Sequence, residues 1–425
     1  MLDLKFIREN AGLVRAGAEA KAQAVDVDRI LAVDAAWREA TSKADALRST
    51  IKTASKEIGG LMKAGDRGGA EAKKREVAEA KTALQEIEKS EGDNRDELNR
   101  LLMRVPNVPD PSVPVGPEET HNEIVHTWGE KPTLGFEIKD HVALCESLGL
   151  VDFKRGVKLS GSGFHVFTGM GAKLERALIG WMIDFHVEKH GYTEVNPPFV
   201  VNSEATTGTG QLPKFGEEMY HVGADDLWLI PTAEVPVTNM HRDEILLADD
   251  LPIKYVAHTP CFRREAGSYG KDVRGLSRVH QFDKVEMVNF VRPEDSSERH
   301  EGLRREAEEI LEALGLHYRT VLISTEGMGF SHSKQYDLEV WAPGANAYLE
   351  ISSCSNFTDF QARRAGIRFR RGAEGKPEFL HTLNASGLAL PRLVIALLET
   401  FQRADGNVDV PEPLRHRLGA DALQP

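Results

Sequence analysis

Two arginines and a glutamate stand side by side at Arg263, Arg264 and Glu265, in a stretch that is typical of a β-strand. Side chains at alternate strand positions share a face, so Arg263 and Glu265 can point into one cleft. A guanidinium in that cleft can grip a phosphate group, and a carboxylate can accept a hydrogen bond from an amino group. The spacing therefore indicates a site for a phosphorylated ligand.

The segments HTPCFRRE and RVHQFDKVEMVNF flank a Gly-rich loop, which predicts an antiparallel hairpin within an α+β domain. On the returning strand Arg278, Phe282 and Glu286 share a parity, so the ring of Phe282 can act as a stacking platform for a base. No GxxxxGK[ST] or strand-linked GxGxxG sequence occurs, so neither a P-loop nor a Rossmann site is supported. Taken alone, the hairpin has a less favoured alternative, in which these charges form surface ion pairs on a sheet edge.

A long heptad pattern precedes this region and predicts an antiparallel hairpin of two helices over residues 28–103, about 50 Å long. The segment LMKAGDRGGA breaks the pattern, and its glycines Gly65, Gly68 and Gly69 are expected to end one helix and open a turn. In the heptad register of the second helix, after the glycine-containing break, Glu91 and Asn94 stand where apolar residues are expected. The first helix carries its apolar residues at Ile30, Val33, Trp37, Ala40, Ala44, Leu47, Ile51, Ala54, Ile58 and Leu61.

Charge is distributed unevenly along the chain. The net charge of -13 argues against a general polyanion-binding protein, yet residues 43–75 hold nine bases and four acids. Seen alone, this basic stretch is more simply the solvated face of a dimerising coiled coil.

Residues 106–120 hold five prolines and predict a linker, so we expect domains at 1–105 and 121–425.

The remaining composition favours a cytoplasmic protein without a membrane span. No apolar run approaches the ~20 residues that a spanning helix needs, and the N-terminus has neither a secretory core nor a transit segment. The three cysteines are too scattered for disulfides or a CxxC metal site, and the histidines lack ligand spacing, so zinc is not expected. His332, Asp337 and Glu339 lie in a strand-like stretch and are assigned to structure rather than to catalysis.

Three ordered motifs give the chain a resemblance to a known family. GAKLERALIGWMIDFHVEKH with GYTEVNPPFVV, FRREAGSYGKDVRGLSRVHQFDKVE, and LNASGLALPRLVIALLE resemble the three motifs of class II aminoacyl-tRNA synthetases. Between them lie GTGQLPKF, TAEVPVTN and EISSCSNFTDFQARR, which are patterns of bacterial seryl-tRNA synthetases. The resemblance implies an N-terminal two-helix arm and a catalytic domain built on an antiparallel sheet flanked by helices.

The resemblance also implies roles for individual residues. Arg263 and Arg392 would be catalytic by stabilising charge on phosphate oxygens, and Mg²⁺ would be held by Glu350 and Ser353. The ATP-binding residues implied are Arg263, Arg264, Glu265, Val279, Phe282, Glu350, Ile351, Ser352, Ser353 and Arg392. The serine-binding residues implied are Thr232, Ala233, Glu234, Glu286, Asn384 and Ser386. The arm residues that would contact tRNA are Lys52, Lys56, Lys63, Arg67, Lys73 and Lys74.

The expected function is ligation of L-serine to tRNA(Ser) with ATP, by a homodimer that binds no DNA. Whether a selenocysteine tRNA is also charged stays open. Alternatives are a second, inhibitor-tolerant copy of the enzyme, a noncatalytic tRNA-binding paralogue, and a ligase that loads a carrier protein. The sequence departs from common family patterns at Gly163, Val273, Ala385 and Pro391, and Pro391 is expected to fit the first turn of a helix.

Overall fold

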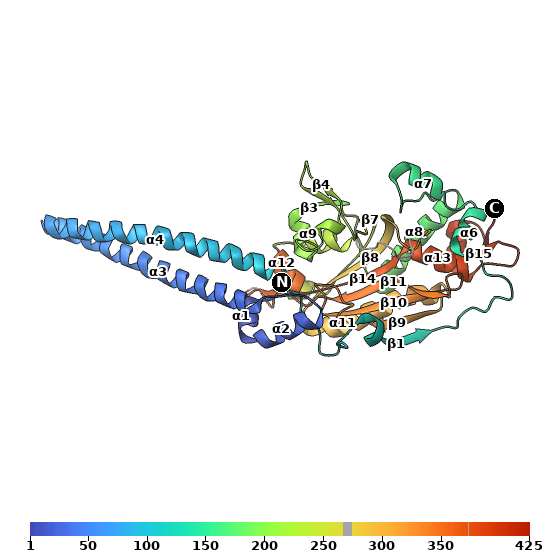
Figure 1. Ribbon diagram of the computed structural model, residues 1–425, viewed down its shortest axis with the longest axis horizontal. Helices are drawn as coiled ribbons and strands as arrows, with labels where there is room; N and C mark the ends of the chain where they lie inside the picture. Colours follow the sequence, from blue (N-terminus) through green and yellow to red (C-terminus); the bar gives the residue numbers. More distant parts are fainter. Residues whose placement is uncertain (267–273, 373) are drawn as a thin grey trace. The chain divides into compact units, whose positions relative to one another are not determined.

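The computed structural model describes residues 1–266, 274–372 and 374–425 and divides into two compact units (Figure 1). One unit holds Leu2–Glu19 and Gln23–Val105, and the other holds Met1, Ala20–Ala22 and Pro106–Pro425. Within the described residues, no helix is both long and apolar enough to cross a bilayer.

The first unit is built around the predicted hairpin. Its helices are α1 (Leu4–Glu9), α2 (Ala11–Ala20), α3 (Val27–Lys63) and α4 (Arg67–Leu102). Along α3 the buried apolar side chains are those of the heptad register, including Ile30, Val33, Ala40, Ala44 and Ala54. The predicted two-helix arm is therefore confirmed.

The turn that joins the two helices of the hairpin is shorter than its three glycines predict. Gly65 has a φ of +78°, which a residue with a side chain rarely adopts, and it makes the turn. The carboxylate of Asp66 then caps α4 by accepting the N–H of Gly69 at 2.9 Å. The expectation that Gly68 and Gly69 open a turn is wrong, because this cap draws both glycines into the first turn of α4.

Residues 106–117 contain no helix or strand, but they are not a free linker. Asn107 is buried, and its amide donates hydrogen bonds to the carbonyl oxygens of Phe357 (2.7 Å) and Ser331 (3.1 Å). The backbone N–H of Asp110 donates to the carbonyl of Ser333 at 2.8 Å. The prolines keep the segment extended, and its polar groups bond to other parts of the second unit.

The second unit is organised by an eight-stranded sheet with the order β1-β9-β10-β11-β14-β8-β7-β2 (Figure 1). Neighbouring strands are antiparallel, except that β2 is parallel to β7. This confirms the predicted antiparallel-rich α+β fold. In sequence order the strands are β1 (Glu123–Trp128), β2 (Thr193–Glu194), β7 (Ile253–Phe262), β8 (Gln281–Val291), β9 (Tyr318–Leu322), β10 (Lys334–Ala342), β11 (Ala347–Asn356) and β14 (His381–Ala389).

Shorter strands and helices complete this unit. The remaining strands are β3 (Val200–Asn202), β4 (His221–Val222), β5 (Leu227–Leu229), β6 (Ile245–Leu247), β12 (Arg368–Arg370), β13 (Glu378–Phe379), β15 (Val408–Asp409) and β16 (Ala422–Leu423). The α-helices are α5 (Glu118–His121), α6 (His141–Ser147), α7 (Phe153–Ser160), α8 (Met170–His190), α9 (Ser203–Thr209), α10 (Glu234–Asn239), α11 (Ser296–Ala313), α12 (Phe360–Ala365), α13 (Leu390–Thr400) and α14 (Glu412–Leu418).

The two faces of the large sheet differ in chemistry. On β8, Val285 and Met287 join the main apolar core, which also contains side chains from α8, α11 and α13. On β14, Leu383 and Ala385 do the same. Because side chains alternate along a strand, the polar residues between them must point to the opposite face. The polar residues that alternate with these apolar ones, Lys284, Glu286, Asn384 and Ser386, are thus assigned to the other face.

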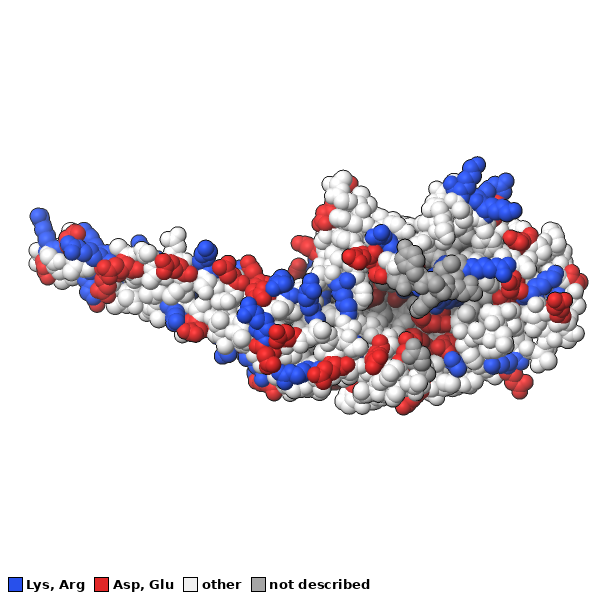
Figure 2. Space-filling model, in the orientation of Figure 1, with Lys and Arg blue, Asp and Glu red and all other residues white. Residues whose placement is uncertain are grey.

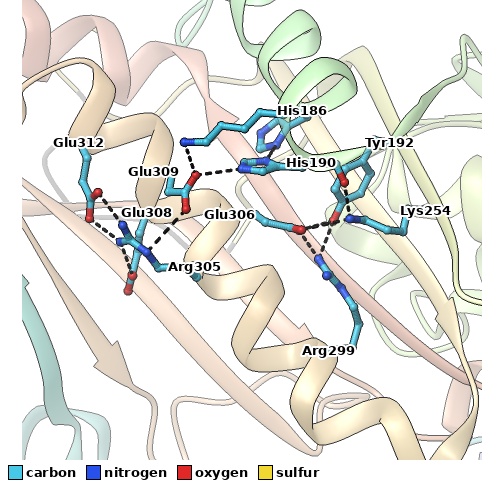
Figure 3. Close-up of polar contacts among 11 residues, drawn as sticks. His186, His190, Tyr192, Lys254, Arg299, Arg305, Glu306, Glu308, Glu309 and Glu312 are labelled. Carbon is cyan, nitrogen blue, oxygen red and sulfur yellow. Dashed lines mark hydrogen bonds and ion pairs between the residues drawn. The ribbon is translucent and has the colours of Figure 1, made fainter.

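A polar network fastens α8 to α11 on the helix-covered face (Figure 3). The imidazole of His190 lies 2.9 Å from His186 Nδ1 and 3.1 Å from a carboxylate oxygen of Glu309. The hydroxyl of Tyr192 donates to Glu306 at 2.7 Å. Burial, and then the charge of His190, lower the pKa of His186 to about 3, so this ring is neutral at physiological pH. The network serves packing, because it lies on the side of the sheet away from the polar face.

The carboxylate of Glu399 on α13 organises three loops. It is fully buried, and it accepts the backbone N–H groups of His141 (2.9 Å), Gly344 (2.8 Å) and Ala345 (3.1 Å). It also lies 3.2 Å from His141 Nδ1. Since His141 Nε2 accepts the backbone N–H of Leu276 at 3.2 Å, the ring proton is on Nδ1 and is donated to Glu399. A buried carboxylate thus fixes the backbone at residue 276.

We expect Glu399→Gln to destabilise the second unit. The new amide NH2 would face N–H donors, and one unsatisfied buried group costs about 1–3 kcal/mol, which is roughly 2–5 °C in melting temperature for a domain of this size. Thermal unfolding followed by calorimetry measures the change. The matched control is Glu412→Gln at an exposed carboxylate of α14, which should leave the midpoint within about 1 °C of wild type. Equal midpoints for both variants would contradict the assigned role.

Candidate active site

A cavity of about 560 Å³ opens on the polar face of the sheet and gathers most of the predicted site residues. It lies over β8, β11 and β14, between the turn before α10 and the start of α13. The predicted residues that line it are Thr232, Glu234, Arg263, Glu265, Val279, Phe282, Glu286, Glu350, Ile351, Ser352, Ser353, Asn384, Ser386 and Arg392. Residues that are far apart in sequence therefore share one site.

Strand alternation explains the wall formed by β8 and β14. On β8, Phe282, Lys284 and Glu286 occupy alternate positions, and all three line the cavity. On β14, Asn384 and Ser386 have the same relation, and Ser386 stands directly opposite Glu286 in the ladder. The predicted parity of Phe282 and Glu286 is thus observed.

A β-bulge explains the wall formed by β11. Glu350 and Ser353 are three residues apart, so a regular strand would place their side chains on opposite faces. In the ladder with β10, Ser352 faces Leu338 and Glu350 faces Glu339, which leaves Ile351 as an extra residue. One inserted residue reverses the alternation, so Glu350 and Ser353 both reach the cavity.

Arg263 and Glu265 follow the end of β7 rather than lying within it. The N–H of Arg263 donates to the carbonyl of His280 at 2.9 Å, which extends the pairing by one residue. The guanidinium of Arg263 lies 5.2 Å from the ring centroid of Phe282. Glu265 has a φ of +50°, so simple strand alternation does not hold there, and its carboxylate pairs with Arg278 at 2.6 Å. Both side chains nevertheless line the cavity.

Arg392 lies in the first turn of α13, directly after Pro391. Its Nη1 donates to the carbonyl of Glu350 at 2.7 Å, and its Nε donates to the carbonyl of Ser277 at 3.2 Å. Pro391 occupies a first-turn position as predicted, where its missing N–H has no helical partner to lose. The guanidinium therefore links α13, β11 and the segment before β8, beside the backbone at Leu276 that Glu399 positions through His141.

The inner wall holds two buried carboxylates and one buried ammonium group. Gln361 Nε2 donates to a carboxylate oxygen of Glu234 at 2.6 Å, and the ammonium of Lys284 forms an ion pair with Glu286. Burial, and then the charge of Glu286, raise the pKa of Glu234 to about 7. Part of the Glu234 population is therefore protonated at neutral pH.

Two predicted residues lie outside the cavity lining. Arg264 is exposed, and its Nη1 donates to the carbonyl of Glu217 at 3.2 Å. Ala233 is fully buried in a second apolar core behind Thr232. Their neighbours line the cavity because the chain turns there, while these two side chains point away from it.

Two neighbours of the predicted site residues, Lys284 and Gln361, were not predicted from the sequence, and His332, which was assigned to structure, lies beside the same site. Lys284 lies between Phe282 and Glu286, two residues from each. It therefore shares their strand parity and could have been predicted to line the same face. Gln361 and His332 come from other segments, and only the tertiary fold brings them to this wall. His332 lines the cavity, and its Nδ1 lies 2.6 Å from Gln335 Oε1. Burial lowers the pKa of His332 to about 3, so it contributes a neutral ring.

The structure accounts for two of the remaining departures. Gly163 has a φ of +80°, and a Cβ there would come within 2.3 Å of the His280 ring, so glycine is required in this conformation. The side chain of Ala385 faces the apolar core on the other side of the sheet, so it takes no room from the residues predicted to bind serine. Val273 lies outside the described residues.

Two family models match the chain. The seryl-tRNA synthetase N-terminal domain matches residues 1–109, and the class II core domain of tRNA synthetases (G, H, P, S and T) matches residues 219–401. The serine–tRNA ligase of Citrifermentans bemidjiense is 51% identical over 419 residues, which cover 99% of each chain. The chain belongs to the serine–tRNA ligase family.

Other serine–tRNA ligases agree in sequence and in fold. That of Geobacter sulfurreducens is 50% identical over 99% of each chain. The crystal structure of seryl-tRNA synthetase from Pyrococcus horikoshii complexed with ATP has a TM-score of 0.94 and 38% identity, and each chain is covered completely. The cytoplasmic serine–tRNA ligase of Naegleria fowleri in complex with AMP has a TM-score of 0.88 and 28% identity, with 100% of this chain and 99% of that one covered. The predicted family, class II fold and enzyme class are confirmed.

We expect Glu234→Gln to stabilise the ligand-free protein at high pH. The folded-state pKa of Glu234 is about 7, above its ordinary value of 4.5. The unfolded chain therefore releases this proton first as the pH rises, and the fold loses up to about 3 kcal/mol between pH 4.5 and 7, with none lost below that window. The difference in melting temperature, variant minus wild type, should increase from pH 5.5 to pH 8. Glu188→Gln, at an exposed site on α8, should show no such trend. A constant difference for Glu234→Gln would contradict the assignment.

Proposed function

We propose that this chain activates L-serine with ATP and then transfers the seryl group to tRNA(Ser). The observation that carries the proposal is the pairing of opposite charges within one cavity, where Arg263 and Arg392 stand on the same face of the sheet as the buried carboxylates Glu234 and Glu286. An amino acid presents an ammonium group and ATP presents phosphates, so the two kinds of charge match the two ligands. The names of the serine–tRNA ligases at about 50% identity support the same reaction.

In the first step a carboxylate oxygen of serine attacks the α-phosphorus of ATP, and the bond to the β-phosphate oxygen breaks to release pyrophosphate. A carboxylate is already a nucleophile, so no protein base is required. Negative charge grows on the phosphate oxygens, and Arg263 and Arg392 supply fixed positive charge next to it. In the second step a hydroxyl of the terminal ribose of tRNA attacks the seryl carbonyl carbon, and AMP leaves.

We assign the nucleotide and the amino acid to opposite ends of the cavity. The ring of Phe282 offers a face for adenine, with Val279 and Glu265 beside it and Ile351 and Ser352 on the neighbouring wall. The polar groups of Thr232, Glu234, Glu286, Asn384 and Ser386 receive serine. Arg264 and Ala233 do not line the cavity, but their backbones brace its edge: the N–H of Arg264 donates to the carbonyl of Glu218 at 2.9 Å, and the carbonyl of Ala233 accepts the N–H of Val237 at 3.0 Å.

The oxygen ligands of β11 fit a magnesium ion. Glu350 contributes a half-exposed carboxylate and Ser353 a hydroxyl, and the bulge at Ile351 places both on the cavity side. One protein carboxylate suffices, because Mg²⁺ in such sites is held mainly by substrate phosphates and water. When bound there, it would neutralise charge on the phosphates of ATP.

We expect Arg263→Ala to reduce serine-dependent ATP–pyrophosphate exchange by about 100-fold or more, because loss of one preorganised charge at a developing anion typically costs ~3–4 kcal/mol. Binding of tRNA in a filter assay should change less than about twofold. Arg263→Lys should recover only part of the activity, since an ammonium lacks the planar fork. Arg403→Ala, at an exposed arginine outside the cavity, is the matched control. Exchange at the wild-type rate in Arg263→Ala would contradict the phosphate role.

We assign tRNA binding to the arm. Lys and Arg side chains gather at the end of the hairpin (Figure 2). The structure divides the six predicted contacts into two groups. Lys73 pairs with Glu57 at 3.0 Å and with Glu76 at 2.8 Å, and Lys74 pairs with Glu71 at 2.6 Å. For the other four, Lys52, Lys56, Lys63 and Arg67, the described part of the chain holds no ion pair. These four cations are therefore the stronger candidates for phosphate contacts.

We expect the combined variant K52Q/K56Q/K63Q/R67Q to raise KM for tRNA in the charging reaction by about 10-fold or more and to flatten its dependence on salt, because each lost phosphate contact removes counterion release. Serine-dependent ATP–pyrophosphate exchange, measured without tRNA, should stay unchanged. The variant K73Q/K74Q should have the smaller effect, since its cations are already paired. Equal effects of the two variants, or a slower exchange reaction, would contradict this assignment.

The homodimer, the cytoplasmic location and the absence of a DNA partner stay predictions, and a selenocysteine tRNA substrate stays open. The edge strand β1 supports a dimer, because it exposes the apolar side chains of Ile124 and Val125. The noncatalytic paralogue is not favoured, since Arg263, Glu350 and Arg392 all line the cavity.

A further inference from the structure

Lys284 is a buried cation within the wall assigned to serine. It lies on β8 between Phe282 and Glu286, and only 5% of it is exposed. Its ammonium donates a hydrogen bond to Thr232 Oγ1 at 2.8 Å and forms an ion pair with the Glu286 carboxylate. Both Thr232 and Glu286 are among the residues that the proposed function assigns to the binding of serine. The cavity therefore already holds one ammonium group at the place where an amino acid is expected to bind.

This contact fixes the hydrogen-bonding role of Thr232. A hydroxyl group has one proton to donate and two lone pairs that accept. Thr232 Oγ1 accepts from Lys284 Nζ and also from the backbone N–H of Glu234 at 3.2 Å. Both lone pairs are thus occupied, and only the proton remains for a ligand. Thr232 can donate to a substrate oxygen, but it cannot accept from a substrate ammonium.

Lys284 also sets the charge of the wall. Glu234 and Glu286 are both buried, and one carboxylate is balanced by the single ammonium of Lys284. With both carboxylates ionised, the remaining charge is one negative unit, which matches the one α-ammonium of a neutral-side-chain amino acid. A substrate with two ammonium groups would leave an excess positive charge in a buried site, which is strongly unfavourable.

We propose that Lys284 is a specificity-determining residue, which occupies the position of a second ammonium group and holds Thr232 as a hydrogen-bond donor. The proposal rests on the proposed function and deepens it. A hydroxyl side chain can accept from Thr232 and donate to a wall carboxylate, whereas a methyl group does neither and an ammonium cannot accept. The wall therefore selects serine over alanine and also over 2,3-diaminopropionate, which carries an amino group in place of the serine hydroxyl.

The test compares wild type, Lys284→Met and Lys284→Arg in ATP–pyrophosphate exchange with serine and with 2,3-diaminopropionate. In Lys284→Met the ratio of kcat/KM for serine over that for diaminopropionate should fall by about 10-fold or more, since a buried hydrogen-bonding mismatch is worth at least that factor. Lys284→Arg keeps the charge and should retain more of the ratio. An unchanged ratio in a Lys284→Met protein that melts like wild type would overturn the proposal.

A second pair of variants keeps the proposal testable where Lys284→Met does not fold. Thr232→Val removes the donated proton at nearly constant volume, and Thr232→Ser keeps it. The preference for serine over alanine should fall by about 10-fold or more in Thr232→Val and stay near wild type in Thr232→Ser. Equal preferences in the two variants would overturn the donor role. Absence of serine-dependent exchange in the wild type would instead overturn the proposed function, so the two failures are distinguishable.

Discussion

Side-chain alternation in the antiparallel strands β8, β14 and β11 is the constraint on which the candidate site depends. Helices α8, α11 and α13 bury one face of the sheet, so apolar residues such as Val285 and Ala385 must stand on that face. The residues between them are left to the other face, where they become cavity wall. Burial of the apolar side chains on one face of these strands thus fixes the positions of the charged and polar side chains on the other face, where the cavity lies.

Local departures from regular geometry adjust this pattern where the chemistry needs it. The extra residue Ile351 reverses the alternation of β11, which brings Glu350 and Ser353 to one face. The ladder between β14 and β8 is irregular between Ser386 and Ala389, and Leu388 there has a φ of +131°. This irregularity directly precedes α13, the helix that opens with the turn carrying Arg392. Such strained positions concentrate where function requires them.

Charge balance within the cavity links stability to function. Glu234 and Glu286 are buried near each other, and each is held by a polar partner, Gln361 in one case and Lys284 in the other. The arrangement remains costly in the ligand-free protein, as the pKa of Glu234 near 7 indicates. A bound ammonium group would relieve that cost. Destabilisation of the empty site is therefore a direct consequence of its complementarity to a cation.

Much of the fold was predictable from periodicity. The heptads of α3 and the hairpin of β7 and β8 depend on local sequence patterns, and both are observed. The helix cap made by Asp66 was not foreseen, because the glycines around it carry a stronger signal for a turn than for a helix. The interaction of Glu399 with His141 could not be predicted either, since residues 258 positions apart meet only in the folded chain.

The site shows the same division. Arg263, Phe282 and Glu286 were found from motif and parity, whereas Gln361 reaches Glu234 from a segment more than a hundred residues away. Glu350 and Ser353 reach the same face of the sheet only because of the bulge at Ile351, which their spacing in the sequence does not reveal. Family resemblance supplied those two residues, and the ladder of β10 and β11 supplies the physical reason.

The most direct test of the central claim is ATP–pyrophosphate exchange with each of the twenty amino acids in turn, followed by charging of total tRNA with any amino acid that responds. The account predicts exchange with serine alone and then formation of seryl-tRNA. Exchange with a different amino acid, or no exchange at all, would contradict it. Exchange with serine that is never followed by charging would contradict the tRNA step and indicate a carrier-protein ligase.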